Sequence, residues 1–267
     1  MSTQEGSFFR RLDVRFPWLK LVATGVLILI IILDLLGLTI SNIPDTTVKA
    51  RVAPMSRHVR ARKDYSGKKL VALTFDDGPS SATTPRLLDI LYEKDVMATF
   101  FVLGKMTRNN PEIIIRAKKD GHVVASHTMY HQNLIRISSG VAESDISEAR
   151  DTIKSILGQT PTLTRPPYGN INNVVREYAG TPLILWSVDT LDWKSKDVEA
   201  ILAVTREQVY DGAIILMHDI YDTSVDAVPL IVDELRSDGY EFVTVPELAK
   251  ERGVNLSAGT AYYNFRP

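Results

Sequence analysis

The chain has 267 residues, of which 45% are apolar, with no cysteine and a formal net charge of −1. This length and apolar content exclude intrinsic disorder and indicate one globular domain with an appendage. The lack of cysteine excludes disulfides, thiolate metal sites and cysteine nucleophiles, and an excess of Asp and Glu after residue 69 argues against nucleic acid as a partner.

A long apolar run near the N-terminus predicts a membrane anchor. Residues 21–40 read LVATGVLILIIILDLLGLTI, which matches the roughly 20 residues that a bilayer-spanning helix requires. Asp34 interrupts the run near its C-terminal end, where a carboxylate reaches interfacial water. We therefore expect a cytoplasmic segment over residues 1–20 and an uncleaved transmembrane signal anchor over residues 21–40. Basic residues flank both ends of the run, so charge alone leaves its orientation open.

Residues 41–68 are predicted to form a basic linker. They contain Pro44, Pro54 and most of the run RHVRARKDYSGKK, with little apolar periodicity. This composition is typical of a solvated tether, and it would equally suit attraction to anionic lipid headgroups or to an anionic wall polymer.

From residue 69 to residue 267 short β-rich runs alternate with longer helical patterns, which predicts βα units and a parallel sheet. We expect seven strands, at residues 70–75, 98–102, 122–127, 162–165, 183–188, 213–217 and 241–244. We expect seven helices between and after them, at residues 85–94, 111–120, 141–157, 172–178, 197–210, 225–238 and 246–252.

Seven such units favour a distorted (β/α)7-8 barrel, although a flat doubly wound sheet would show the same alternation. The placement of polar residues favours the barrel, because barrels gather functional groups at the C-terminal ends of their strands. Five polar residues lie at or just after predicted strand ends: Asp76, His127, Arg165, Asp189 and His218.

Two adjacent carboxylates and a histidine pair form a candidate metal site. Asp76 and Asp77 close an apolar strand in TFDDGPS, and His127 and His131 follow in SHTMYH. Alone, the first run is typical of a turn and the second of a structural histidine pair. If residues 127–131 form a helical turn, both imidazoles project from one face. Together with Asp77 they would supply two nitrogens and one oxygen to a cation and leave a coordination position open, with Asp76 free as a base.

Five motifs in order resemble those of the polysaccharide deacetylase family, also called NodB-homology domains or family 4 carbohydrate esterases. They are TFDDGPS, SHTMYH, RPPYG at residues 165–169, DTLDW at residues 189–193 and LMH at residues 216–218. The resemblance covers residues 69–252 and is strongest to bacterial membrane-anchored peptidoglycan N-acetylglucosamine deacetylases.

The resemblance implies a role for each matching residue. Asp77, His127 and His131 would bind one divalent metal, which is usually zinc in this family, although cobalt or nickel also suit such a ligand set. Asp76 would be the general base.

On the leaving-group side, the resemblance makes His218 the general acid and Asp189 the residue that hydrogen-bonds and tunes it. Arg165 would orient Asp76, and the backbone N–H of Tyr168 would bind the oxyanion. Trp193 and Leu216 would wall the acetyl pocket, with core packing as the alternative for both.

These features together predict a membrane-anchored, metal-dependent enzyme that removes N-acetyl groups from a cell-wall polysaccharide and releases acetate. Peptidoglycan N-acetylglucosamine is the expected substrate, because an anchor and a short linker keep the domain at the membrane face. That substrate would require a cytoplasmic N-terminus and an extracytoplasmic domain. The alternatives are chitooligosaccharide, poly-N-acetylglucosamine or acetylxylan as substrate, or a catalytically silent glycan-binding protein. The sequence does not indicate the oligomeric state.

Overall fold

The computed structural model describes residues 64–267. The predicted cytoplasmic segment, the transmembrane anchor and nearly all of the predicted linker lie outside these residues. Within the described part of the chain, no helix has both the length and the apolar character needed to cross a membrane.

The main sheet is parallel and has the order β3-β2-β1-β6-β5, with β7 paired to β1. Its strands are β1 (Lys69–Asp76), β2 (Thr99–Val102), β3 (Val123–Ser126), β5 (Val188–Asp189), β6 (Ala213–His218) and β7 (Tyr240–Phe242). Asp76 is the partner of His218 in the register of β1 and β6. The parallel order therefore brings the carboxyl ends of these two strands, and two predicted catalytic residues, to the same edge.

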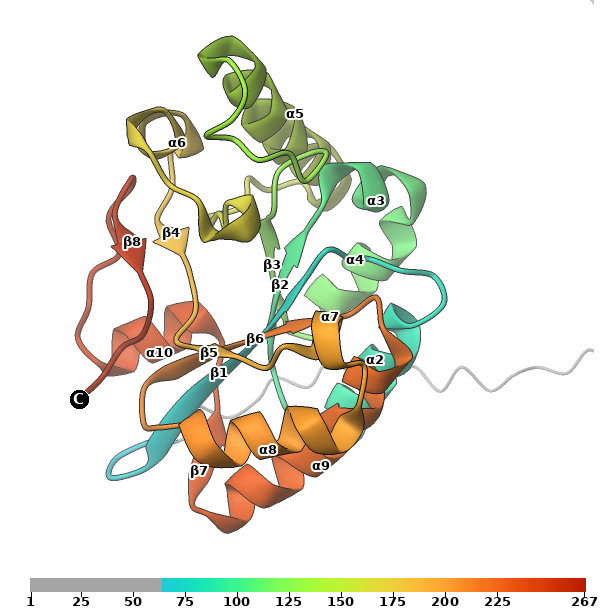
Figure 1. Cartoon of the computed structure of the whole chain (residues 1–267), viewed down its shortest axis with the longest axis vertical. Helices are drawn as coiled ribbons and strands as arrows, with labels where there is room; N and C mark the ends of the chain where they lie inside the picture. The colour runs from blue at the N-terminus through green and yellow to red at the C-terminus, as the bar shows by residue number, and fades with distance from the viewer. Residues whose placement is uncertain (1–63) are drawn as a thin grey trace, which may run out of the picture. The chain divides into compact units, whose positions relative to one another are not determined.

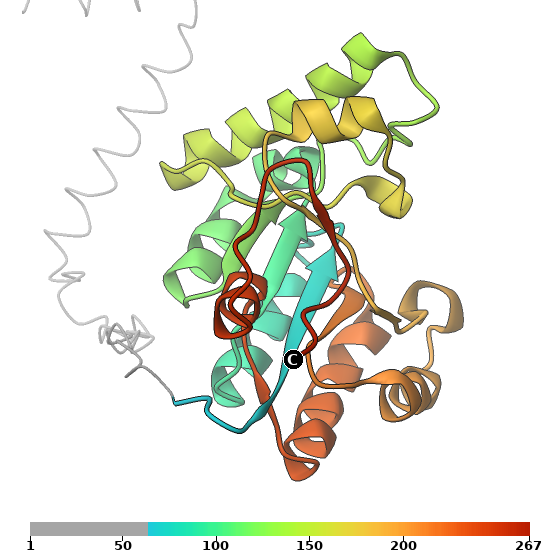
Figure 2. The same ribbon diagram turned by 90° about the vertical axis from the view of Figure 1, so that its left-hand side faces the viewer.

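A smaller pair of strands completes the arrangement. β4 (Leu183–Ile184) and β8 (Ala261–Tyr262) are parallel to each other, and Figure 2 shows the C-terminal segment lying beside β4. Isolated bridges connect Thr164 to both Ser126 and Leu183, and Ala213 to Asn264. The two sheets are thus linked at both sides, which is consistent with a distorted barrel.

Alternate residues of β1 enter two different cores, as the two-residue period of a strand requires. Val71, Leu73 and Phe75 pack among apolar residues of the outer helices. Leu70 and Ala72 belong to a second, inner cluster that includes Phe265 from the C-terminal segment. Both faces of the strand are buried, as in other parallel sheets covered on both sides.

Helices surround the main sheet (Figure 1). The seven predicted helices are all present within a few residues, as α2 (Thr84–Glu93), α4 (Pro111–Lys119), α5 (Ser139–Leu157), α6 (Asn173–Ala179), α8 (Val198–Gln208), α9 (Asp222–Ser237) and α10 (Val245–Glu251). Three short elements were not predicted: α3 (Gly104–Asn109), the 3-10 turn η3 (Pro167–Gly169) and α7 (Asp192–Ser195).

Two of the seven predicted strands differ from the structure. The run at residues 162–165 contributes only the bridging residue Thr164, because Pro161 before it and Pro166 and Pro167 after it have no N–H to donate to a longer ladder. The run at residues 183–188 is divided into β4 and β5, and an eighth strand, β8, was not predicted.

Candidate active site

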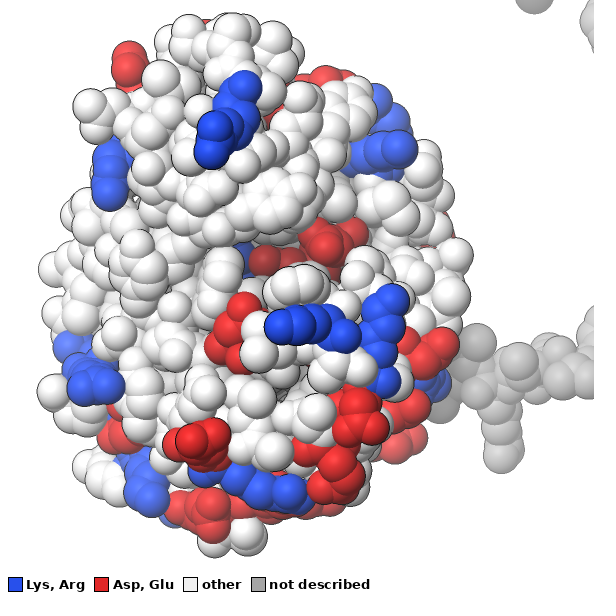
Figure 3. Space-filling model, viewed as in Figure 1, with Lys and Arg blue, Asp and Glu red and all other residues white. Residues whose placement is uncertain are grey.

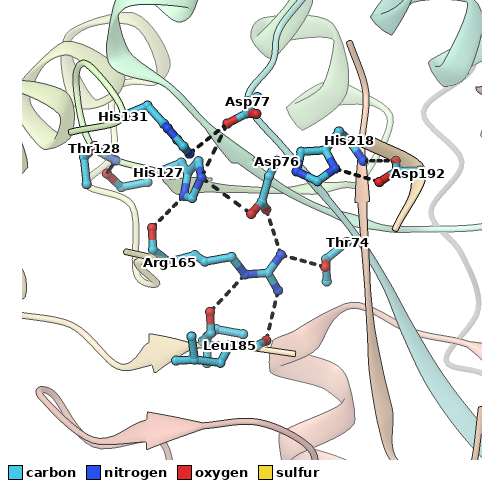
Figure 4. Close-up of polar contacts among 12 residues, drawn as sticks. Thr74, Asp76, Asp77, His127, Thr128, His131, Arg165, Leu185, Asp192 and His218 are labelled. Carbon is cyan, nitrogen blue, oxygen red and sulfur yellow. Dashed lines mark hydrogen bonds and ion pairs between the residues drawn. The ribbon is translucent and has the colours of Figure 1, made fainter. Parts of the chain in front are cut away.

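The predicted site residues come together at the carboxyl edge of the main sheet (Figure 4). Asp76 ends β1, His218 ends β6, and His127 follows β3 directly. Arg165 follows the bridging residue Thr164. The space-filling view shows acidic side chains inside a hollow on this face (Figure 3). The structure therefore brings together the polar residues that the sequence placed at strand ends.

Asp77, His127 and His131 form a compact group of three potential metal ligands. One ligand atom from each lies within 4.8 Å of the others, and the group is the single cluster of this kind among residues 64–267. The Nε2 atoms of both histidines lie 3.5 Å from Oδ1 of Asp77. That oxygen is buried and has no hydrogen-bond partner. A buried, unpartnered carboxylate oxygen facing two imidazoles fits a divalent cation such as zinc.

The local backbone that presents these ligands is a loop and not the helical turn expected at residues 127–131. Asp77, Thr128 and His131 have φ values of 76°, 68° and 57°, in the left-handed region. Such conformations are rare for residues other than glycine and are found at functional sites. The loop brings the rings of His127 and His131 to a centroid separation of 5.0 Å.

His127 is held in the tautomer that a metal ligand needs. Its Nδ1–H donates to the carbonyl oxygen of Arg165 at 2.7 Å, so Nε2 carries the lone pair that faces Asp77. Burial lowers the pKa of His127 to about 3, and the imidazole is therefore neutral at physiological pH.

Asp76 lies beside the same group, with Oδ2 at 3.5 Å from Nε2 of His127, and is fixed by Arg165. Nη1 of Arg165 donates to Oδ1 of Asp76 at 2.7 Å and to Thr74 Oγ1 at 2.9 Å. The guanidinium is fully buried, and it also donates to the carbonyls of Ile184 and Leu185 at 3.0 and 3.1 Å. Burial raises the pKa of Asp76, although the positive charge of Arg165 opposes this shift. A carboxylate of raised pKa is the better proton acceptor.

His218 is held by Asp192, so the prediction that Asp189 performs this role is wrong. The Asp192 carboxylate accepts from Nδ1 of His218 at 2.8 Å and from its backbone N–H at 2.7 Å. Ser224 Oγ and the Trp193 N–H also donate to it, at 2.6 and 2.9 Å. Asp189 Oδ1 instead accepts from the N–H of Leu191 at 2.9 Å.

The physical reason is the turn between the two aspartates. Asp189 pairs with Leu216 in the register of β5 and β6, two positions before His218. Leu191, with a φ of 54°, then turns the chain so that Asp192 lies buried beneath the histidine. Burial of His218 opposes its protonation, but the Asp192 carboxylate outweighs this and raises the pKa to about 9. The imidazole is therefore protonated at neutral pH and can donate a proton.

The three predicted substrate-contacting residues have different surroundings. The Tyr168 ring packs edge-on against His131 at 4.7 Å, and its backbone has a φ of 60°. Tyr168 and Trp193 are 59% and 45% exposed, which rules out core packing for Trp193. Leu216 is 4% exposed within β6, and burial of this kind fits both core packing and the wall of a pocket.

Asp219 is a residue near the site that the sequence did not single out. It is buried, and Thr84 Oγ1 donates to its Oδ2 at 2.6 Å, while Oδ1 has no partner. Burial, with the nearby charges of Asp77 and Asp76, raises its pKa to about 7. Its carboxylate lies against Gly78. In the sequence Asp219 is simply the acidic residue directly after LMH. Its place near the site becomes apparent only in the fold.

Comparison with known proteins agrees with this geometry. The family model for polysaccharide deacetylase matches residues 63–181. The peptidoglycan-N-acetylglucosamine deacetylase PgdA of Listeria monocytogenes is 40% identical over 219 residues, which are 82% of this chain and 46% of PgdA. The peptidoglycan-N-acetylmuramic acid deacetylase PdaC of Bacillus subtilis is 44% identical over 181 residues, 68% of this chain and 39% of PdaC. The chain thus spans less than half the length of either relative.

A solved structure shows that the similarity extends to the fold. The T48 deacetylase, determined with substrate, is 40% identical and superimposes with a TM-score of 0.71. The match covers 75% of this chain and 99% of that chain.

Proposed function

The chain belongs to the polysaccharide deacetylase family, and on this basis we propose that it hydrolyses N-acetyl groups of amino sugars in peptidoglycan and releases acetate. One observation carries the proposal. The cluster of Asp77, His127 and His131 lies beside a buried carboxylate fixed by an arginine, and a histidine fixed by an aspartate ends the neighbouring strand. This arrangement brings a metal-ligand group, a base and an acid together at one edge of the sheet. The printed names of PgdA and PdaC, both peptidoglycan deacetylases, support the choice of polymer.

Asp77, His127 and His131 would hold one divalent cation, for which their nitrogen and oxygen donors favour zinc and also accept cobalt or nickel. When bound, the cation would supply Lewis-acid polarisation of the acetamide carbonyl and would lower the pKa of a water molecule. Arg165 prepares the ligand set by accepting the Nδ1–H of His127 on its carbonyl oxygen.

Asp76 would act as general base in the first half of the reaction. Its carboxylate takes a proton from the attacking water while the water oxygen forms a bond to the acetamide carbonyl carbon. The buried guanidinium of Arg165 holds the Asp76 carboxylate in a fixed orientation. The backbone N–H of Tyr168 would donate to the oxyanion that develops on the carbonyl oxygen.

His218 would complete the reaction as general acid. Its Nε2–H donates a proton to the amide nitrogen as the carbon–nitrogen bond breaks, so that a neutral amine leaves and acetate remains. Asp192 keeps the imidazole protonated and correctly oriented through its bond to Nδ1. The exposed rings of Tyr168 and Trp193 would flank the sugar, and Leu216 would form the floor of the acetyl pocket.

We further propose that residues 21–40 anchor the enzyme in the cell membrane, with the N-terminus in the cytoplasm and the catalytic domain outside. The apolar run of that length supports a span, and peptidoglycan as substrate requires an external domain. A cysteine introduced at Ser257, an exposed position, should react with a membrane-impermeant reagent in intact cells. Failure of the folded protein to react would argue against this topology.

The enzymatic proposal is tested by acetate release from purified peptidoglycan by the full-length chain in detergent. We expect release to stop after chelation and to return when zinc, cobalt or nickel is added back. Absence of metal-dependent release from peptidoglycan, chitooligosaccharide and acetylxylan alike would overturn the proposal. Release from one of the latter two alone would move the assignment to that polymer.

A further inference from the structure

A lysine and a tyrosine lie beside the proposed acid, His218. The rings of His218 and Tyr221 have a centroid separation of 6.1 Å. The ammonium of Lys196 lies 5.1 Å from the centroid of the Tyr221 ring. The Tyr221 ring is therefore close both to the proposed acid and to the ammonium of Lys196.

The positive charge of Lys196 has no carboxylate partner within residues 64–267. Three nearby carboxylates are engaged elsewhere. Asp192 holds His218, Asp197 accepts from the N–H of Ala200 to cap α8, and Asp222 pairs with Arg86. In Figure 3, positive side chains lie over α7 at the border of the acidic hollow. This charge is therefore available to a bound anion.

The backbone of Lys196 is hydrogen-bonded to that of Asp192, the residue that holds the acid. Its backbone N–H donates to the carbonyl of Asp192 at 3.0 Å, and its φ is 48°. A left-handed conformation costs a residue with a side chain on the order of 1 kcal/mol. The side chain of Asp192 thus holds His218, while its backbone carbonyl accepts from the backbone N–H of Lys196.

We propose that Lys196 and Tyr221 form a subsite for a sugar that bears a carboxylate and neighbours the N-acetyl sugar being deacetylated. The subsite rests on the proposed function. The Tyr221 ring would pack against the sugar face and the ammonium would pair with the carboxylate. N-acetylmuramic acid has such a carboxylate on its lactyl group, whereas chitin and xylan backbones have none. A peptide amide-bonded to the lactyl group removes this carboxylate, so the subsite would favour wall glycan with peptide-free muramic acid over neutral polymers.

Initial rates on matched oligosaccharides of equal length test this subsite in the full-length chain. The substrates are a neutral N-acetylglucosamine oligomer, an oligomer alternating N-acetylglucosamine and N-acetylmuramic acid, and the methyl ester of the latter. A fourth substrate carries peptides on the lactyl groups and distinguishes a peptide carboxylate from the lactyl carboxylate. We expect kcat/KM to be about tenfold higher for the free acid than for its ester. Rising salt should reduce this preference, because the pair is exposed.

Substitutions test whether the preference for the acid comes from the positive charge of Lys196. Lys196→Gln should lower kcat/KM on the free acid about tenfold and leave the neutral oligomer unchanged. Lys196→Arg should keep the preference for the acid. Lys194→Gln, two residues earlier and also exposed, is the matched control and should behave as the wild type.

Equal rates on the acid and its ester with the wild type, or an unchanged preference in Lys196→Gln, would overturn the subsite. If no oligomer releases acetate, the proposed function fails instead. The subsite is then tested by binding, without the need for activity. Calorimetry measures the affinity of the acid and of the ester for the Asp76→Asn variant, with and without Lys196→Gln. Tighter binding of the acid, lost on substitution of Lys196, would support it, and equal binding would refute it.

Discussion

Asp76 and Asp77 are adjacent in the chain but meet different partners in the fold. Asp76 is bound by a buried arginine, whereas Asp77 presents a buried oxygen without a hydrogen bond to two imidazoles. Asp77 has a left-handed φ directly after β1, where the strand ends. Two neighbouring carboxylates can therefore serve different functions, one as a base and one as a metal ligand.

The Asp76→Asn variant should bind metal as the wild type does, because Asp77, His127 and His131 are unchanged. Its kcat should fall by about 100-fold or more, since an amide cannot accept the proton. His127→Ala should instead lose metal affinity. Metal content by inductively coupled plasma mass spectrometry, measured beside kcat, checks both. Full metal occupancy in His127→Ala would refute the ligand set.

The Asp192→Asn variant should narrow the pH range of activity. The carboxylate raises the pKa of His218 to about 9, and a general acid loses function as pH rises through its pKa. Without that charge the pKa falls, so the alkaline limb of kcat should move to lower pH.

The control for Asp192→Asn is Asp189→Asn, because Asp189 bonds to the Leu191 N–H and not to His218. Its alkaline limb should stay in place. A shift in Asp189→Asn without one in Asp192→Asn would contradict the assignment. The sequence DTLDW contains both aspartates at plausible spacing, and only the turn at Leu191 decides between them.

At the scale of elements, the loop that follows β1 depends on close packing against β6. A Cβ at Gly78 would collide with the Asp219 carboxylate, which also accepts from Thr84 at the start of α2. Gly78→Ala should therefore displace the loop that holds Asp77, at a cost of about 1–3 kcal/mol in the free energy of unfolding.

Gly78→Ala should lower metal affinity as well as stability. Isothermal titration with the metal measures the affinity, and denaturant unfolding measures the stability. Gly140 lies in α5, and a Cβ there would meet no atom within 4 Å. Gly140→Ala is the matched control and should stabilise the protein by about 0.5–1 kcal/mol. Unchanged metal affinity in Gly78→Ala would show that the contact with Asp219 does not position Asp77.

The long elements could be predicted from periodicity and the short ones could not. α5 and α9 span several turns, and β1 is eight residues long, so hydrophobic patterns identify them. β4, β5 and β8 have two residues each, too few for any period to appear. Their pairing depends on partners distant in the chain, which local sequence does not reveal.

At the scale of the whole domain, the C-terminal segment links the two sheets. Asn264 bridges to Ala213 at the start of β6, and the N–H of Phe265 donates to the carbonyl of Gly212 at 2.8 Å. The Phe265 side chain is 3% exposed and belongs to the inner core. The end of the chain thus fills the interior beside β1.

The Phe265→Ala variant should lower the free energy of unfolding by about 3–5 kcal/mol, because it leaves a cavity in that core. Tyr263 is 52% exposed two residues earlier, and Tyr263→Ala should change stability little. Denaturant unfolding of the two variants checks this difference. Equal stability would mean that the segment does not contribute to the core.

More of the domain and its site than of the membrane location could be checked against the structure. Five motifs at strand ends sufficed to predict where the site residues meet, because parallel strands bring their carboxyl ends to one edge. The anchor at residues 21–40 lies outside the described residues and stays a prediction, as do the individual roles at the site and the polymer.

Mass spectrometry of wall glycan from cells with and without the gene tests the central claim most directly. We predict that wild-type cells contain glucosamine or muramic acid residues without acetyl groups, and that these residues disappear on deletion. Wild-type protein should restore them, and Asp76→Asn should not. Identical acetylation of the glycan in the two strains, with the protein present in the wild type, would contradict the account.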